Sequence, residues 1–159
     1  MLDTEKQALI ETFYTAFQNK DYATMANCYH PEAEFRDEAF TLKGKQARAM
    51  WHMLIERGTD LELTFSVREE MGQITAHWEP VYSFSQTGRH VHNIIDASFE
   101  FKDGKIYRHT DKFDFWRWSR QALGLPGLLL GWTPLLQKKV SKMAMGTLQQ
   151  FIEKHPEYQ

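Results

Sequence analysis

The sequence predicts an α+β domain in which a curved, cone-shaped antiparallel sheet is wrapped over N-terminal helices and encloses an apolar pocket. Apolar residues recur at helical spacing before residue 58, whereas they alternate at period two between residues 61 and 115. Helices therefore precede a sheet of antiparallel strands, which is an α+β order. An aromatic content of 14% fits a cavity lined by aromatic side chains.

Three helices are predicted at the N-terminal end. Asp3 or Thr4 caps the first helix, and Asp21 caps a shorter second one that ends near Tyr29. The third helix runs from about Lys45 to Arg57, where Gly58 stops it. The inward residues of the first and third helices are Leu9, Ile10, Phe13, Tyr14, Phe17, Ala47, Met50, Trp51, Leu54 and Ile55.

The first strand carries a carboxylate. Ala33, Phe35 and Asp37 alternate with Glu34 and Arg36, which places Asp37 on the apolar side. In the alternative interpretation the strand ends at Phe35 and Asp37 lies in a turn. The pattern leaves both possibilities open.

The stretch from Arg89 to Trp116 predicts a hairpin that turns at Lys102-Asp103-Gly104. A three-residue loop with Gly104 in the left-handed conformation joins the apolar sets of the two strands on one face, whereas a two-residue loop separates them. Register follows the hydrophobic pattern, so we expect the three-residue loop. The inward residues are then Val91, Asn93, Ile95, Ala97, Phe99, Phe101, Tyr107, His109, Asp111, Phe113 and Phe115.

The strands before this hairpin place further residues on the same face. Leu61 to Val67 alternate cleanly, and Ile74, Ala76, Trp78, Tyr82 and Phe84 form the next inward set. Pro80, in the middle of that set, indicates an edge strand or a bulge. A two-residue turn at Thr87-Gly88 predicts that Tyr82 lies opposite Asn93 and Trp78 opposite Ala97.

Polar groups on this apolar face have two interpretations. Asn93, His109 and Asp111 form either a buried structural network or the polar part of a pocket. In the second case loss of hydration raises the pKa of a carboxylate.

Composition narrows the class of protein. A formal charge of −2 provides no basic field for nucleic acid. Cys28 is the single cysteine, so neither a disulfide within the chain nor a cysteine zinc site is expected. His90 and His92 have strand spacing but face solvent in the predicted sheet, and we expect no metal and no cofactor. The N-terminus lacks signal-peptide character, and the apolar run from Leu123 to Trp132 is too short to span a bilayer. A cytoplasmic protein without integral membrane association is expected.

Two segments, Tyr29–Asp37 and Asp103–Asp114, resemble the nuclear transport factor 2-like superfamily and within it the SnoaL-like group. That group includes polyketide cyclases, ketosteroid isomerase and limonene epoxide hydrolase. The resemblance covers roughly residues 5 to 116. It implies a SnoaL-like domain over residues 1–116 and a helical C-terminal extension over 117–159 that packs on the same domain.

The resemblance also implies roles for single residues. Asp37 occupies the place of the general base of ketosteroid isomerase, and Tyr14, with Phe13 competing, that of an oxyanion donor. Ile95-Asp96 matches a second donor by letter, but the predicted register turns Asp96 outward. Asp111 matches one Asp of the epoxide hydrolase triad. Trp78 and Pro80 replace the other two members, which argues against that mechanism.

We therefore expect acid–base catalysis without a cofactor on a small hydrophobic molecule, of isomerase, dehydratase or cyclase type. The expected catalytic residues are Asp37, Asp111 and His109, and the expected substrate-binding residues are Tyr14, Trp51, Trp78, Tyr82, Asn93 and Phe113. The alternatives are a non-catalytic binder of a lipid-like ligand and a dimeric protein-interaction module. A homodimer is expected, paired back to back through the outward face that carries His90, His92, Ile94, Asp96 and Ser98.

The extension contains an unusually apolar loop. A short helix closes at Gly124, residues 125–132 form the loop, and Thr133 caps a last helix that begins with Pro134. An apolar segment of this size must bury itself. It caps the cavity mouth, forms a dimer contact or touches a membrane surface.

Overall fold

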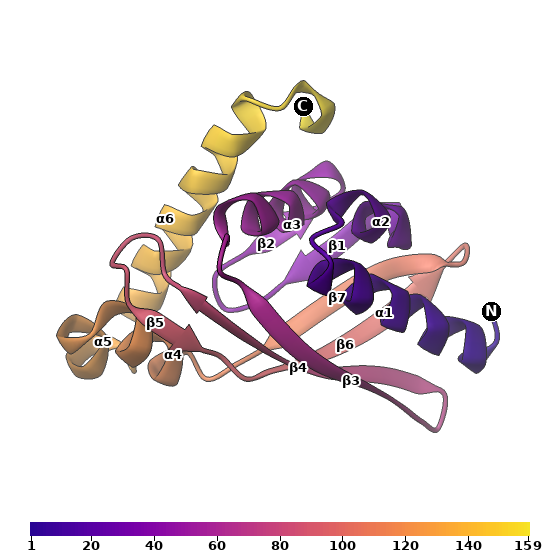
Figure 1. The fold of residues 1–159 in the computed structure, drawn as a ribbon, viewed down its shortest axis with the longest axis horizontal. Helices are drawn as coiled ribbons and strands as arrows, with labels where there is room; N and C mark the ends of the chain where they lie inside the picture. The colour runs from indigo at the N-terminus through magenta and orange to yellow at the C-terminus, as the bar shows by residue number, and fades with distance from the viewer.

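The computed structural model describes all 159 residues, and a curved sheet of seven strands forms its framework (Figure 1). The helices are α1 (Asp3–Gln18), α2 (Tyr22–Cys28), α3 (Lys45–Arg57), α4 (Phe115–Leu123), α5 (Leu125–Leu130), α6 (Pro134–Glu153) and the 3-10 turn η1 (Pro156–Tyr158). The strands are β1 (Tyr29–Arg36), β2 (Thr41–Lys43), β3 (Glu62–Glu70), β4 (Gln73–Ser83), β5 (His90–His92), β6 (Ile95–Lys102) and β7 (Lys105–Lys112).

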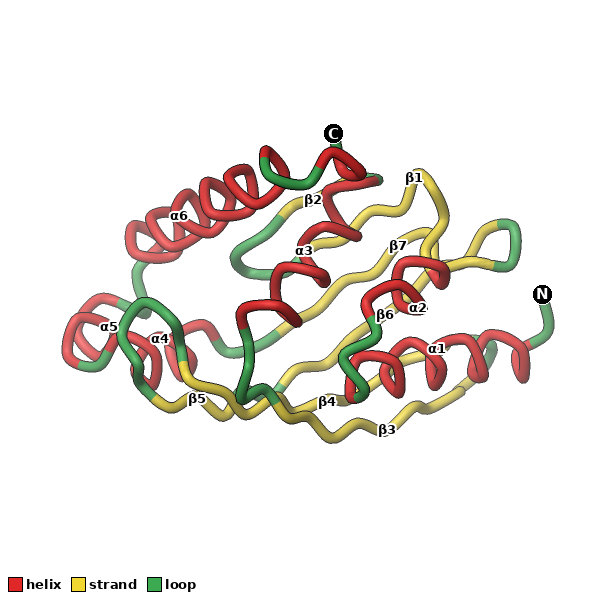
Figure 2. Tube along the Cα trace, turned by 45° about the horizontal axis from the view of Figure 1, so that its top comes forward, coloured by secondary structure: helices red, strands yellow, loops and turns green.

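The sheet has the strand order β2-β1-β7-β6-β4-β3, and β5 pairs with β4. All pairs are antiparallel except β1 and β7, which run parallel. Helices α1, α2 and α3 lie together on one side of the sheet (Figure 2). The predicted α+β class and cone-shaped sheet are confirmed, with one parallel pair that the sequence pattern did not indicate.

The core lies between these helices and the sheet. The predicted stripe of α1 is buried: Ile10, Phe13, Tyr14 and Phe17 are each at most 2% exposed. Asp21 caps α2 by accepting a hydrogen bond from the backbone N–H of Thr24. Helix α3 has the predicted limits and packs Met50 and Trp51 into the same cluster.

The β6–β7 hairpin has its two apolar sets on one face, as predicted. A two-residue turn followed by a β-bulge produces this arrangement, in place of the expected three-residue loop. Lys102 pairs with Lys105, so the turn has two residues, and both Asp103 and Gly104 have positive φ, as a type I′ turn requires. The register then shifts between Glu100 and Phe101, and the extra residue is Tyr107. This bulge restores the apolar face, so that Phe99 lies opposite His109 and Ala97 opposite Asp111.

The register between β4 and the strands after it differs from the prediction by two residues. Tyr82 pairs with Val91 and Trp78 with Ile95, because residues 85–88 form a longer loop than the predicted two-residue turn. The inward face is unchanged, since a shift of two preserves side-chain direction. Pro80 is neither at an edge nor in a bulge. It lies opposite the short gap between the end of β5 and the start of β6, and its carbonyl accepts a hydrogen bond from the N–H of Asn93.

Helix α6 packs against the elements that precede it. Leu148, Phe151 and Ile152 of α6 belong to the main core cluster, and Val140 packs with Phe115 and Trp118 of α4 in a second one. None of the helices combines the length and the apolar character that crossing a bilayer requires.

Candidate functional site

A cavity of about 250 Å³ lies between the sheet, α3, α4 and α6. Its wall is largely apolar, and the polar residues that line it include Asp37, Tyr82, Asn93 and Asp111, which come from distant parts of the chain. Trp51, Trp78 and Phe113, also expected at a binding site, line it as well. The tertiary structure therefore brings both predicted carboxylates to one space.

Asp37 follows the last residue of β1 and lies in a turn. Its Oδ1 accepts hydrogen bonds from the backbone N–H groups of Ala39 and Phe40, each at 2.7 Å, and no hydrogen bond engages Oδ2. Asp37 thus lies in a turn, as the second interpretation predicted, but the strand ends at Arg36 and not at Phe35. The carboxyl group of Asp37 nevertheless lines the cavity.

The protonation of Asp37 is set by its surroundings. Burial raises the pKa of Asp37 to about 7, and the charge of Asp111 adds to the effect, while the two backbone N–H donors oppose it. A carboxyl group of this kind exchanges a proton near neutral pH.

Asp111 ends a buried chain of hydrogen bonds. Trp51 Nε1 lies 2.8 Å from Tyr29 Oη, Tyr29 Oη lies 2.8 Å from His109 Nδ1, and His109 Nε2 lies 2.8 Å from Asp111 Oδ1. All four side chains are buried. The chain links α3, β1 and β7, and His109 lies behind Asp111 without lining the cavity.

The direction of this chain follows from its first member. An indole nitrogen only donates, so Tyr29 Oη accepts from Trp51 and its own hydrogen is free to donate to His109 Nδ1. The hydrogen on the His109 ring is then on Nε2, which donates a hydrogen bond to Asp111 Oδ1. Sequence reasoning missed Tyr29, which it placed at the end of a helix.

Donor groups of Tyr82, Asn93 and Trp78 at the cavity are left without a protein acceptor. Tyr82 Oη accepts from Trp118 Nε1 at 2.9 Å, which leaves its own hydrogen available. Asn93 Oδ1 accepts from the N–H of Ile94 at 3.0 Å, so that its Nδ2 is free. Trp78 Nε1 is buried without a partner. Burial raises the pKa of Tyr82, with a further contribution from Asp37, so the phenol keeps its proton.

Tyr14 does not line the cavity, contrary to the expectation that it binds substrate. Its ring stacks on Phe65 with centroids 5.4 Å apart, deep in the core, and its hydroxyl has no hydrogen-bond partner. Phe17, one turn further along α1, reaches the cavity instead. Asp96 faces outward, as the predicted register requires, and lies 2.8 Å from His77 Nδ1.

One group of potential metal ligands lies outside the cavity. Donor atoms of His52, His155 and Glu157 are within 4.8 Å of one another, where the C-terminal turn meets α3. Nδ1 of His52 is already hydrogen-bonded to the hydroxyl group of Tyr158, at 2.8 Å. On the outer face of the sheet, Nε2 of His92 lies 2.8 Å from Glu79.

Comparison with known proteins identifies the family to which this fold belongs. A family model described as the SnoaL-like domain matches residues 10–109. No curated protein matches the chain.

Several solved structures are similar in fold. A protein from Xanthomonas campestris pv. campestris, provisionally described as a polyketide cyclase, is 20% identical with a TM-score of 0.61, covering 74% of this chain and 96% of that one. An LEH-like epoxide hydrolase of M. tuberculosis is 19% identical with a TM-score of 0.59, covering 79% and 96%. A protein from Kribbella flavida DSM 17836, provisionally described as a ketosteroid isomerase, is 14% identical with a TM-score of 0.55, covering 69% and 78%. At these identities the similarity concerns the fold alone.

Proposed function

Since the chain belongs to the SnoaL-like domain family, we propose that its cavity carries out acid–base catalysis, without a cofactor, on a small hydrophobic substrate. The observation that carries the proposal is the pair of carboxyl groups on one apolar cavity with different surroundings. Asp37 has a pKa near 7 and a free Oδ2, whereas Asp111 is held as an acceptor by His109. Unequal pairs of this kind suit proton transfer.

Asp37 acts as the base in this proposal. Its Oδ2 takes a proton from a carbon next to a carbonyl group, and the electron pair of the C–H bond moves towards the carbonyl oxygen. Tyr82 Oη and Asn93 Nδ2 supply donors for the negative charge that develops there. In isomerisation Asp37 returns the proton to another carbon. In cyclisation the electron pair forms a bond to a second carbonyl carbon, and the proton goes to the oxygen of that carbonyl. In dehydration the electron pair expels a hydroxyl group, which leaves as water with the proton. Isomerisation, cyclisation and dehydration share this first step.

Asp111 orients the polar part of the substrate. Its charge also helps to keep the pKa of Asp37 raised, which makes Asp37 a stronger base once it ionises. His109, Tyr29 and Trp51 position Asp111 through the buried chain. His109 and Tyr29 lie outside the cavity lining, whereas the Trp51 ring also forms part of the cavity wall.

A second candidate is a carrier of a lipid-like ligand. The mostly apolar wall of the cavity favours it, as does the complete hydrogen bonding of His109, which a purely structural network also explains. A carrier needs no base. Loss of the Asp37 carboxylate should therefore abolish turnover if the protein is an enzyme, and should leave ligand binding in place if it is a carrier.

Hydrogen–deuterium exchange tests the proposal without knowledge of the product. The protein is incubated in D₂O with a panel of small cyclic and linear apolar ketones, and deuterium incorporation next to the carbonyl is followed by mass spectrometry. We expect exchange to rise with pH around an apparent pKa near 7, and Asp37→Asn to slow it by at least about 100-fold. Glu100→Gln, which removes an exposed carboxylate on the outward face of β6, is the control and keeps the rate. Equal exchange by Asp37→Asn and the native protein contradicts the proposal.

A further inference from the structure

Helix α5 and the residues after it expose an unusually large set of apolar side chains. Leu125 is 64% exposed, Leu129 59%, Trp132 70% and Leu135 75%. We call the apolar tip the set Leu125, Leu128, Leu129, Leu130, Trp132 and Leu135. In Figure 1 α5 lies at the left end of the molecule, beyond the sheet. The structure thus places the most apolar part of the extension in contact with solvent.

Glycines hold α5 in this orientation. A side chain at Gly127 would bring its Cβ within 1.9 Å of the Ser119 carbonyl oxygen, and one at Gly131 within 1.9 Å of Ser119 Oγ. These two residues are four apart, so they share one face of the helix, and that face is pressed against α4. Because the glycine face packs inward, the leucine face must point outward. The exposure is therefore built into the packing between α4 and α5.

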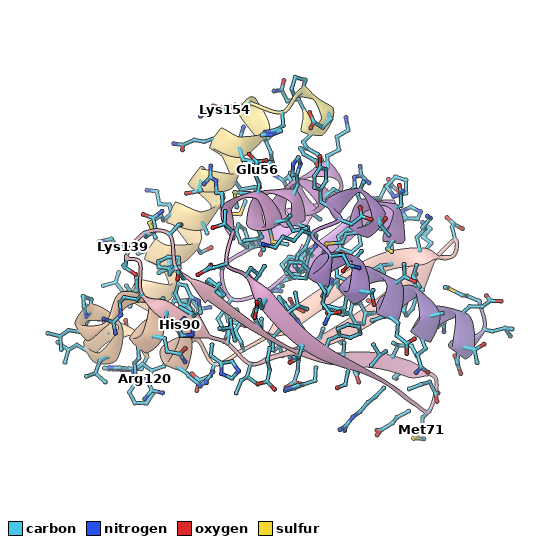
Figure 3. The ribbon with its side chains drawn as sticks, in the orientation of Figure 1. Glu56, Met71, His90, Arg120, Lys139 and Lys154 are labelled. Carbon is cyan, nitrogen blue, oxygen red and sulfur yellow. The ribbon has the colours of Figure 1, made fainter.

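Basic residues flank the apolar tip in the sequence. The chain has a net charge of −2, yet residues 115–152 contain no Asp or Glu and five basic residues: Arg117, Arg120, Lys138, Lys139 and Lys142. Figure 3 shows Arg120 and His90 near α4 and α5, and Lys139 at the beginning of α6. The basic residues thus come from the elements on both sides of α5 in the chain.

A basic groove lies on α4 and the start of β5. Arg89, His90, Arg117, Arg120 and Gln121 line it, and no apolar residue does. None of the three arginines pairs with a carboxylate. Arg89 donates to the carbonyl of Gln121 and Arg117 to that of His92, both at 2.8 Å, while Arg120 stacks on Trp116. Guanidinium groups without carboxylate partners suit binding of phosphate oxygens.

We propose that the apolar tip and the basic groove dock this protein onto the surface of an anionic phospholipid bilayer. The leucines and Trp132 enter the boundary between headgroups and acyl chains, and the arginines bind lipid phosphates. Apolar side chains flanked by Arg and Lys, with a Trp at the boundary, are the features of proteins that lie on a membrane. Docking of this kind is independent of the chemistry proposed for the cavity.

Charge favours a bilayer over a second copy of the chain as the occupant. A symmetric contact through the tip would bring the same basic residues of both copies together, and like charges at an interface oppose association. An anionic surface instead attracts them, with a strength that falls as salt screens the charges.

Vesicle flotation with the full chain tests the proposal. We expect the protein to float with vesicles of phosphatidylcholine mixed with phosphatidylglycerol, to float less at high salt, and to remain unbound with phosphatidylcholine alone. Leu129→Asp should weaken partitioning by at least about tenfold, and Arg120→Glu should weaken it on anionic vesicles. Met71→Asp adds the same charge at a fully exposed turn at the other end of the molecule and should bind as the native protein does (Figure 3).

Two further measurements identify the bound species. Trp132→Leu should keep vesicle binding and reduce the blue shift of tryptophan fluorescence that accompanies it. Inorganic phosphate at the lipid phosphate concentration should not displace the protein from vesicles. Absence of flotation, equal binding by Leu129→Asp, or displacement by free phosphate overturns the proposal. So does a dimer in sedimentation that Leu129→Asp dissociates, which would make the tip a contact between copies.

Discussion

His109 and Asp111 are two residues apart on β7, and Nε2 of His109 donates to Oδ1 of Asp111 over 2.8 Å. Residues i and i+2 of a strand point to the same face, so the histidine ring can reach along the strand to its neighbour. The bond occupies one oxygen of a carboxylate that lines the cavity. His109 thereby connects the cavity to the buried side chains of Tyr29 and Trp51.

Tyr29→Phe tests the buried chain. The change removes the hydroxyl that accepts from Trp51 and donates to His109, so two buried polar atoms lose their partner. We expect a loss of about 1–3 kcal/mol in the free energy of unfolding, measured by urea denaturation. Tyr107→Phe, whose hydroxyl makes no hydrogen bond, is the matched control and should change stability by less than about 0.5 kcal/mol. Similar losses in both variants would show that the chain contributes nothing specific.

Asp37→Asn should change the pH dependence of stability. The folded protein keeps the Asp37 proton up to about pH 7, whereas the unfolded chain releases it near 3.8, so between these values the folded state binds more protons. The contribution of Asp37 is therefore full below about pH 4 and declines as pH rises to 7, by at most about 4 kcal/mol. Urea denaturation at pH 5 and 8 should show a larger decline for the native protein than for the variant. An identical pH profile would mean that the pKa of Asp37 is ordinary.

The inward face of β6 is tested by neighbouring substitutions. Phe99 is 5% exposed in the core, whereas Glu100 is exposed and pairs with Arg108 at 3.3 Å. Phe99→Ala should cost about 3–5 kcal/mol and Glu100→Ala less than about 0.5 kcal/mol in chemical denaturation. Equal costs would place the wrong face of β6 inward.

The back-to-back homodimer stays a prediction. The outward face of the sheet carries Ile94, which is 40% exposed, beside the cluster in which His77 contacts Glu79 and Asp96. Sedimentation velocity should show a dimer that Ile94→Arg dissociates, because the guanidinium would lose its hydration at the contact. Leu129→Asp, on the apolar tip, should leave the dimer intact. A monomer at all concentrations would remove the prediction.

Much of the fold could be predicted from local patterns. Period-two alternation placed Asn93 and Asp111 inward, and helical spacing identified the buried stripe of α1, because both patterns report which side of an element faces the core. The same patterns predicted wrong details between strands. They placed Tyr82 opposite Asn93 instead of Val91 and expected a three-residue turn where Asp103-Gly104 is followed by a bulge at Tyr107. Loop length and bulges shift register by whole residues, and periodicity within one strand does not report them.

The sequence by itself determined the fold class and the inward direction of Asp111, since both follow from which residues must leave water. Only the tertiary structure decided which side chains from distant parts of the chain lie next to one another. Parallel pairing of β1 with β7 brings Tyr29 to His109 across 80 positions of the chain. The turn after Arg36 directs Asp37 to the same cavity as Asp111, and core packing places Tyr14 away from it. Such contacts depend on how separate elements pack in three dimensions, which no local pattern contains.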